Sequence, residues 1–209
     1  GVLGFLVVIW LIPALQSWSI TNIDWYGAGR LEAGLLIDGQ WWRAFTALTL
    51  HADLAHIVAN SIFGAIFGVM VGRYLGSGFG WLLVLLSAGL GNTLNAWLRP
   101  DEFRSLGAST ATFACVGLFA AFVWRRGYFR GRGWRRSFAP VFSAVALLAF
   151  TGMGGANTDV LAHVTGFGSG LAAGILVARF DLRRLGYSGQ YISGASAILL
   201  IAMAWMLAT

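Results

Sequence analysis

Four side chains that can support acid–base or nucleophilic chemistry stand in long apolar segments of this chain. They are His56 and Asn60 in "HADLAHIVAN", Ser109 in "LGAST" and His163 in "AHVTGFGSG". A serine hydroxyl becomes a useful nucleophile when an adjacent base removes its proton, and imidazole titrates near neutral pH. Ser109 and His163 are therefore a candidate nucleophile and base.

His56 and Asn60 suit a second task in the same chemistry. Attack of a serine on a carbonyl creates an oxyanion, and each fixed hydrogen-bond donor typically stabilises it by about 2.7–4 kcal/mol. Residues four apart share one helix face, so both side chains can donate together with the backbone N–H of Ser109. Asp159, one turn before His163, is expected in water, which leaves a Ser–His dyad without an orienting carboxylate.

Each of these residues also has an ordinary structural interpretation. A serine in an apolar helix often packs against a neighbour or bonds to its own helix, and a lone histidine can be a core residue. A metal site is disfavoured because Ser and Asn are poor transition-metal ligands and no Cys, Asp or Glu joins them. The single cysteine, Cys115, lies in an apolar run and is expected to be a small core residue. We expect no metal and no cofactor.

Composition indicates an integral membrane protein. The 209 residues are 58% hydrophobic and 11% charged, whereas soluble domains are about a quarter charged. Glycine (29) and tryptophan (10) are abundant. Glycine is common where membrane helices contact each other, and tryptophan is common at the membrane–water interfaces. All 14 basic residues are arginine and lie between apolar runs, which favours topology-setting charge over nucleic-acid binding.

The chain is predicted to be one all-α, polytopic membrane helical bundle over residues 1–209. About 20 apolar residues cross a bilayer, and seven segments qualify: 1–16, 53–72, 78–98, 107–124, 138–153, 159–178 and 191–208. The first lacks the basic start and the cleavage site of a signal peptide, so we expect a transmembrane helix. The 35 residues after it are rich in Trp, Leu and Phe and are expected to form short amphipathic helices in the interface.

Arginine distribution predicts the orientation of the spans. Ten of the 14 arginines follow the second, fourth and sixth spans, and the positive-inside rule makes those loops cytoplasmic. The second, fourth and sixth spans then enter from the outer side. Each carries its polar residues within about two turns of 5.4 Å pitch, so these can converge in an outward-opening pocket, with His51 at the outer surface. The glycine row Gly166, Gly170 and Gly174 allows close approach to small residues of the fourth span, namely Ala108, Ala111 and Ala114.

The order of these motifs resembles that of the rhomboid family of intramembrane serine proteases. The resemblance covers about residues 39–174, from "GQWWRAFTALTLHADLAHIVAN" through "LGAST" to "AHVTGFGSG". The family's Trp-Arg element matches Trp42 and Arg43, and its His-x-x-x-Asn motif matches His56 and Asn60. Its Gly-x-Ser motif begins at Gly107. Its His-x-x-Gly-x-x-x-Gly motif matches the positions His163, Gly166 and Gly170.

The resemblance implies a role for each matching residue. Ser109 would be the nucleophile and His163 the base, with an oxyanion site formed by His56, Asn60 and the Ser109 amide. The ring of Phe113, one turn after the serine, would pack against the base. The family also implies a six-helix core, here about 1–180, plus a seventh helix at about 191–208. The expected location is a prokaryotic plasma membrane, with the active site opening to the extracytoplasmic side.

One position departs from the family pattern, because Thr110 follows the serine where glycine is usual. If that position needed a φ that only glycine adopts, Thr110 would lower activity, whereas a helical φ would tolerate it.

Two functions follow: a protease that cuts transmembrane protein substrates near their outer ends, or a catalytically impaired rhomboid-like module that binds or escorts membrane proteins. A transporter is disfavoured because the polar residues are shallow and no internal repeat is evident. Substrate identity and oligomeric state stay open.

Overall fold

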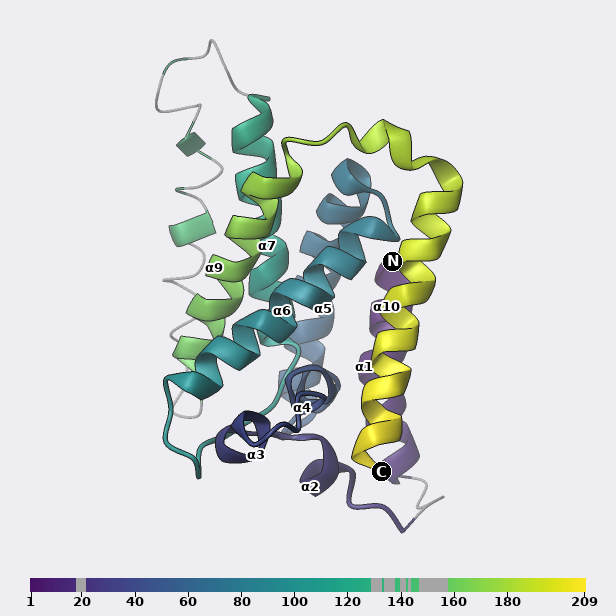
Figure 1. Ribbon diagram of the computed structural model, residues 1–209, viewed down its shortest axis with the longest axis vertical. Helices are drawn as coiled ribbons and strands as arrows, with labels where there is room; N and C mark the ends of the chain where they lie inside the picture. The colour runs from purple at the N-terminus through teal and green to yellow at the C-terminus, as the bar shows by residue number, and fades with distance from the viewer. Residues whose placement is uncertain (18–21, 129–132, 134–137, 140–141, 143, 147–157) are drawn as a thin grey trace.

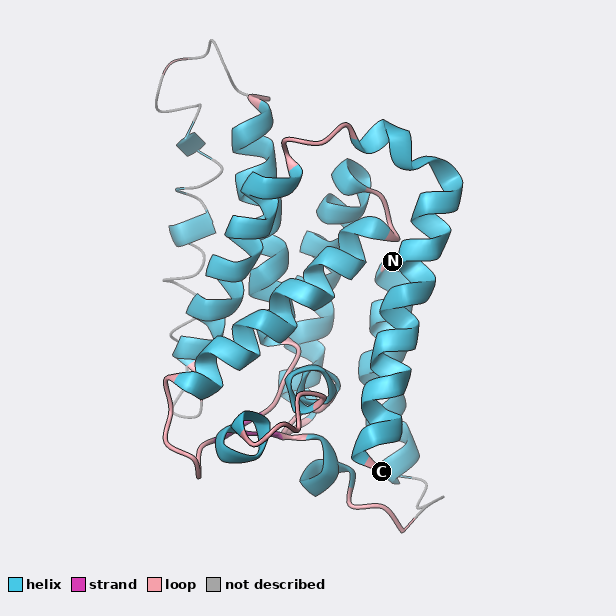
Figure 2. Cartoon of the chain, viewed as in Figure 1, coloured by secondary structure: helices cyan, strands magenta, loops and turns pink. Residues whose placement is uncertain are grey.

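The chain folds into a bundle of helices (Figures 1 and 2). The structure is a computed structural model that describes residues 1–17, 22–128, 133, 138–139, 142, 144–146 and 158–209. Its long helices are α1 (Val2–Ser17), α5 (Leu54–Leu75), α6 (Phe79–Trp97), α7 (Ser109–Arg126), α9 (Val160–Val177) and α10 (Gly186–Ala208). The predicted helical membrane bundle is confirmed.

The helix ends follow local capping chemistry. Asp53 accepts a hydrogen bond from the His56 N–H at the start of α5, and Asp159 accepts one from the Ala162 N–H at the start of α9. Gly127 ends α7 with a φ of 72°, a left-handed conformation that suits glycine. Six predicted spans thus coincide with long helices, although α10 begins five residues before the expected 191. The predicted span 138–153 lies largely outside the described residues, so the count of seven stays a prediction.

Within the described part of the chain, four helices are long and apolar enough to cross a membrane: α5, α6, α9 and α10. Helix α1 has only 16 residues. Helix α7 is less apolar because its last turn carries Arg125 and Arg126 and its first turns carry serine and threonine. Thirteen of its 18 residues are buried by other helices. A central helix faces protein instead of lipid, so it tolerates small polar residues that a lipid-facing helix would not.

Helices α7 and α9 pack so closely that only glycine fits at the contact. A Cβ on Gly170 would lie 2.2 Å from the Ala114 carbonyl oxygen, and one on Gly174 would lie 2.4 Å from that of Leu118. The predicted glycine row on α9 therefore does face α7. Of the three expected partners on the α7 side, Ala114 does face Gly170. Ala108 instead packs with residues of α1 and α5, and Ala111 joins the main core.

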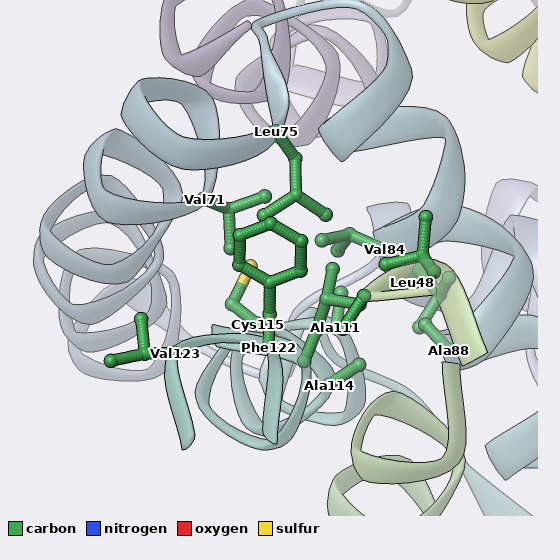
Figure 3. Packing of buried hydrophobic residues seen from close by; sticks show 13 residues of the cluster. Leu48, Val71, Leu75, Val84, Ala88, Ala111, Ala114, Cys115, Phe122 and Val123 are labelled. Carbon is green, nitrogen blue, oxygen red and sulfur yellow. The ribbon is translucent and has the colours of Figure 1, made fainter. Parts of the chain in front are cut away.

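The main core lies between α5, α6 and α7 (Figure 3). Val71 and Leu75 of α5 and Val84 of α6 meet Cys115 and Phe122 of α7 there. Cys115 is 1% exposed, as expected for a small core residue. This apolar packing fixes α7 against its neighbours and thereby fixes the residue at its start, Ser109.

The segment between α1 and α5 forms short elements at one end of the bundle, in the lower part of Figure 1. They are α2 (Trp25–Gly29), β1 (Leu31–Glu32), α3 (Ala33–Ile37), α4 (Arg43–Thr46) and the 3₁₀ helix η1 (Ala47–Thr49). Strand β1 pairs antiparallel with β2 (Arg104–Ser105). Short helices were expected here, but the two-residue strand pair was not. It draws the loop before Ser109 against this segment.

Candidate active site

The four candidate residues line one cavity of about 790 Å³ near the N-terminal ends of α5, α7 and α9. His56 and Asn60 come from α5, Ser109 from α7 and His163 from α9. The apolar part of the wall includes Phe113 of α7. Residues more than 100 positions apart in the chain therefore meet in one cavity, near the same ends of their three helices.

Ser109 is the first residue of α7, and no side chain caps this helix end. The first N–H groups of a helix have no partner within it, and the aligned peptide dipoles make this end partly positive. The backbone at Ser109 thus offers N–H groups and a favourable field for negative charge. Both properties suit an oxyanion next to the hydroxyl.

Gly107 brings the His56 ring against the serine. Its φ of 133° lies in the region that only glycine adopts readily. A Cβ at Gly107 would lie 2.6 Å from His56 Cε1, 2.8 Å from His56 Nε2 and 3.7 Å from Ser109 Oγ. The imidazole and the hydroxyl therefore flank the same small space, and any side chain at position 107 would fill it.

Asn60 carries a buried donor next to this space. The residue is 6% exposed and lines the cavity, and its Nδ2 has no hydrogen-bond partner among the residues that the structure describes. An unpaired buried amide costs free energy. A buried, unpaired donor at the wall of a cavity can bind a ligand oxygen that develops negative charge.

His163 is held against α7 by an aromatic contact. It is 6% exposed, and its ring centroid lies 4.5 Å from that of Phe113 with 35° between the ring planes. Gly166, one turn later, faces Thr110, whose carbonyl oxygen would lie 2.6 Å from a Cβ at that glycine. The close approach of the two helices therefore places the candidate base beside the turn that carries Ser109.

Asp159 differs from the sequence-based expectation that it stands in water. Its side chain is only 15% exposed. One carboxylate oxygen accepts from Asn95 Nδ2 at 2.7 Å, and the other accepts from Arg99 Nη2 at 3.1 Å and from the Ala162 N–H at 3.2 Å. The carboxylate thus joins the start of α9 to the end of α6, one turn before His163. The sequence signal for this contact was the four-residue spacing of Asn95 and Arg99 at the end of the third predicted span, which places both side chains on one side of the helix end.

Comparison with known proteins decides the family. A family model described as the Rhomboid domain matches residues 38–180, more than half of the chain. The chain belongs to the rhomboid family. Together with its apolar helices, this makes it an integral, multi-pass membrane protein.

Several curated rhomboids are similar to this one. The rhomboid protease GluP of Bacillus subtilis is 31% identical over 200 residues, which are 95% of this chain and 37% of GluP. The putative rhomboid protease YdcA of the same organism is 25% identical over 188 residues, 88% of this chain and 89% of YdcA. The rhomboid protease GlpG of Pectobacterium atrosepticum is 30% identical over 148 residues, 68% of this chain and 49% of GlpG. The chain thus spans little more than a third of GluP.

A second residue of this rhomboid that sequence reasoning misplaced is His51. It was expected at the outer surface, yet it is 3% exposed. Burial, reinforced by the neighbouring His56, lowers its pKa to about 3, so the ring is neutral and can accept a hydrogen bond. The Ala108 N–H donates to His51 Nε2 at 3.4 Å. His51 therefore holds the backbone immediately before Ser109.

The Trp-Arg element of this rhomboid supports the site from a distance. Arg43 is 7% exposed and donates to Gln40 Oε1 at 2.7 Å and to the carbonyl oxygens of Gly27 and Arg30 at 3.1 and 2.7 Å. Trp42 makes an edge contact with Trp41. Among the cavity-lining residues that the structure describes, neither Trp42 nor Arg43 is included. Their contacts organise the short elements between α1 and α5.

Proposed function

We propose that this chain is an intramembrane serine protease that uses a Ser109–His163 dyad. The observation that carries the proposal is the shared cavity, in which Ser109, His163, His56 and Asn60 converge from three helices. Membership of the rhomboid family supports it independently. The catalytic roles of these residues are our assignment.

The proposed reaction proceeds in two halves. His163 takes the proton of Ser109 Oγ as the oxygen attacks the scissile carbonyl carbon, and the resulting imidazolium then protonates the departing amine. Water enters the cavity and attacks the acyl carbon while it gives a proton to His163. The imidazolium then returns this proton to Ser109 Oγ as the new carboxyl terminus of the substrate leaves, which restores the hydroxyl. In both halves the oxyanion lies near the Asn60 Nδ2, the His56 ring and the free N–H of Ser109.

The proposed substrates are transmembrane proteins cut near one end of their membrane helix. A peptide bond inside an intact helix has its carbonyl hydrogen-bonded and is sterically shielded, so the segment must unwind before Ser109 can reach it. The lining of the cavity includes apolar side chains such as Phe63 and Phe67 together with the charged side chains of Arg99 and Arg104. Such a wall suits a segment that leaves the bilayer.

The proposed orientation opens the cavity to the extracytoplasmic side of a prokaryotic plasma membrane. Ten of the 14 arginines follow the second, fourth and sixth predicted spans, away from the helix ends that carry the candidate residues. The positive-inside rule assigns those arginine-rich loops to the cytoplasm. Water for hydrolysis would then come from the outer aqueous phase.

The geometry of Thr110 favours an active protease over an impaired binding or escort module. Thr110 is the second residue of α7, a regular helical position, so no glycine-only φ is required there. Its side chain is buried where two helices approach, and its Cγ2 would lie 2.8 Å from a Cβ at Gly166 and 3.2 Å from one at Gly91. Threonine therefore fills a packing position without distorting the turn of the nucleophile.

The proposal is tested with the full chain purified in detergent and a fluorophosphonate probe that reacts with activated serines. Wild type is expected to label and to cleave a model transmembrane substrate. Ser109→Ala abolishes labelling, and His163→Ala abolishes both activities. Ser193→Ala, at a buried serine of α10, is the matched control and keeps wild-type labelling. Cleavage that survives in both the Ser109 and the His163 variant would refute the dyad, and an unlabelled wild type would favour the escort module.

A further inference from the structure

Helix α10 lies outside the residues that match the Rhomboid domain, 38–180, and at the edge of the bundle (Figure 1). Only 11% of the residues in its most apolar stretch are buried, and side chains such as Leu199 and Met206 are mostly exposed. A helix with so little buried surface is held by the few specific contacts that it makes. In the part of the chain that the structure describes, Gln190 and Trp205 make such contacts, one near each end of α10.

The first contact joins α10 to the turn between α5 and α6. Gln190 Oε1 accepts from the N–H groups of Gly78 and Phe79, both at 3.0 Å, and Gln190 Nε2 donates to the Leu75 carbonyl oxygen at 3.1 Å. The amide thus satisfies backbone groups at two helix ends. This contact fixes the first turns of α10 but lies far from the cavity, at the opposite ends of α5 and α7.

The second contact is made by Trp205, which is 9% exposed. Its Nε1 donates to Thr49 Oγ1 at 3.1 Å, and its ring makes an edge contact with Trp25, with centroids 5.3 Å apart. Gly29 leaves room for this ring, because a Cβ there would lie 2.3 Å from Trp205 Cη2. The indole is therefore inserted into the short elements between α1 and α5.

Thr49 belongs to the segment that supports the serine loop. It is 1% exposed and donates to the Thr46 carbonyl oxygen at 2.8 Å. Two residues before it, the Ala47 carbonyl oxygen accepts from the Gly107 N–H at 2.9 Å. Two residues after it, His51 accepts from the Ala108 N–H. Thr49 thus lies midway between the two anchors of the backbone that leads into Ser109.

Apolar packing joins the same parts. Trp205, Ile12 and Leu50 form one buried cluster, and Leu106 packs against it. Leu106 directly precedes Gly107, whose φ of 133° aims the chain into α7. The cluster that contains the indole therefore contacts the serine loop through Leu106, and the indole itself bonds to the supporting segment at Thr49.

We propose that Trp205 is a positioning residue for Ser109, and that α10 is required for nucleophile reactivity although it lies beyond the family domain. Trp205 holds the segment 47–51 in the one arrangement that anchors Gly107 and Ala108. The proposal rests on the proposed protease function. Loss of the indole N–H loosens this segment, so Ser109 samples positions from which its proton transfer and attack are misaligned.

The test is the rate of fluorophosphonate labelling of Ser109, with Trp205→Phe, Thr49→Val and their double variant in the full chain. Trp205→Phe keeps an aromatic ring without the donor, and Thr49→Val keeps the shape without the acceptor. Each single variant is expected to label about 3- to 10-fold more slowly, the size expected for one net hydrogen bond. Thr49→Val removes the acceptor of the Trp205 bond together with its own bond to the Thr46 carbonyl oxygen. The double variant is therefore expected to be no slower than Thr49→Val, because the indole N–H has already lost its partner there.

Controls separate positioning from general destabilisation. Met206→Ala, at the exposed neighbour of Trp205, keeps the wild-type rate. Labelling is measured well below the unfolding temperature of each variant, and substrate cleavage is expected to show a lower kcat with little change in KM. Rates equal to wild type in both single variants, or effects that add in the double variant, would overturn the role of Trp205. A wild type that does not label would instead refute the proposed function.

Discussion

Replacing Gly170 with alanine is expected to separate α9 from α7 and to impair the dyad. The added Cβ would lie 2.2 Å from the Ala114 carbonyl oxygen and 2.9 Å from its carbonyl carbon and Cα. These are backbone atoms of a buried helix and cannot rotate away. Ordinary contact begins near 3.4 Å, so the helices must part locally by about 1.2 Å, the difference between these two distances.

The expected effect on activity exceeds the effect on stability. Overpacking of this kind costs about 1–3 kcal/mol, and the better helix propensity of alanine returns up to about 1 kcal/mol. Catalysis is more sensitive, because a displacement of about 1 Å can reduce a rate by about 100-fold. His163 lies two turns before Gly170 on the same helix, so a shift of α9 moves the base relative to Ser109. We expect cleavage and labelling to fall by about 10- to 100-fold.

Gly168→Ala is the matched control, since Gly168 lies on the same helix and no atom lies within 4 Å of its added Cβ. It should keep full activity and an equal or higher unfolding temperature. The assay compares the rates of substrate cleavage and fluorophosphonate labelling, with the thermal midpoint of each variant measured in the same detergent. Equal labelling rates for Gly170→Ala and Gly168→Ala would refute the idea that close α7–α9 packing sets the geometry of the dyad.

Three further predictions concern neighbouring residues. Asp159→Ala should slow labelling of Ser109 more than Asp159→Asn does, because asparagine keeps an N-cap acceptor worth about 0.5–2 kcal/mol; equal rates for the two variants would contradict this. Thr110→Gly should lower the free energy of unfolding by about 1–2 kcal/mol, through lost packing and helix propensity, without raising kcat; a faster enzyme would mean that threonine impairs the turn. Because the pKa of His51 is about 3 in the native protein and about 6.5 when unfolded, the unfolded chain binds the extra proton. Stability should therefore fall as the pH drops from about 6.5 towards 3, and less steeply in His51→Gln, as denaturation at several pH values would reveal.

Local patterns were enough to predict six long helices and to place the candidate residues near the same ends of three of them. Apolar runs of about 20 residues and the four-residue spacing of His56 and Asn60 are properties of neighbouring residues. They depend on helix geometry alone. The prediction of which small residues face the α9 glycines was partly wrong. Small residues such as Ala108 occur on several sides of the α7 segment, and only the packing of the helices selects one side.

The sequence by itself therefore determined which segments are helical and apolar, and which side chains could perform chemistry in them. Tertiary structure alone decided three further features. These are the burial of His51, the capture of Asp159 by Asn95 and Arg99, and the bond from Trp205 to Thr49 across 156 positions. The physical reason is that polar groups in a buried region must find partners wherever the packed helices bring them, and no local pattern records which distant segment will supply the partner.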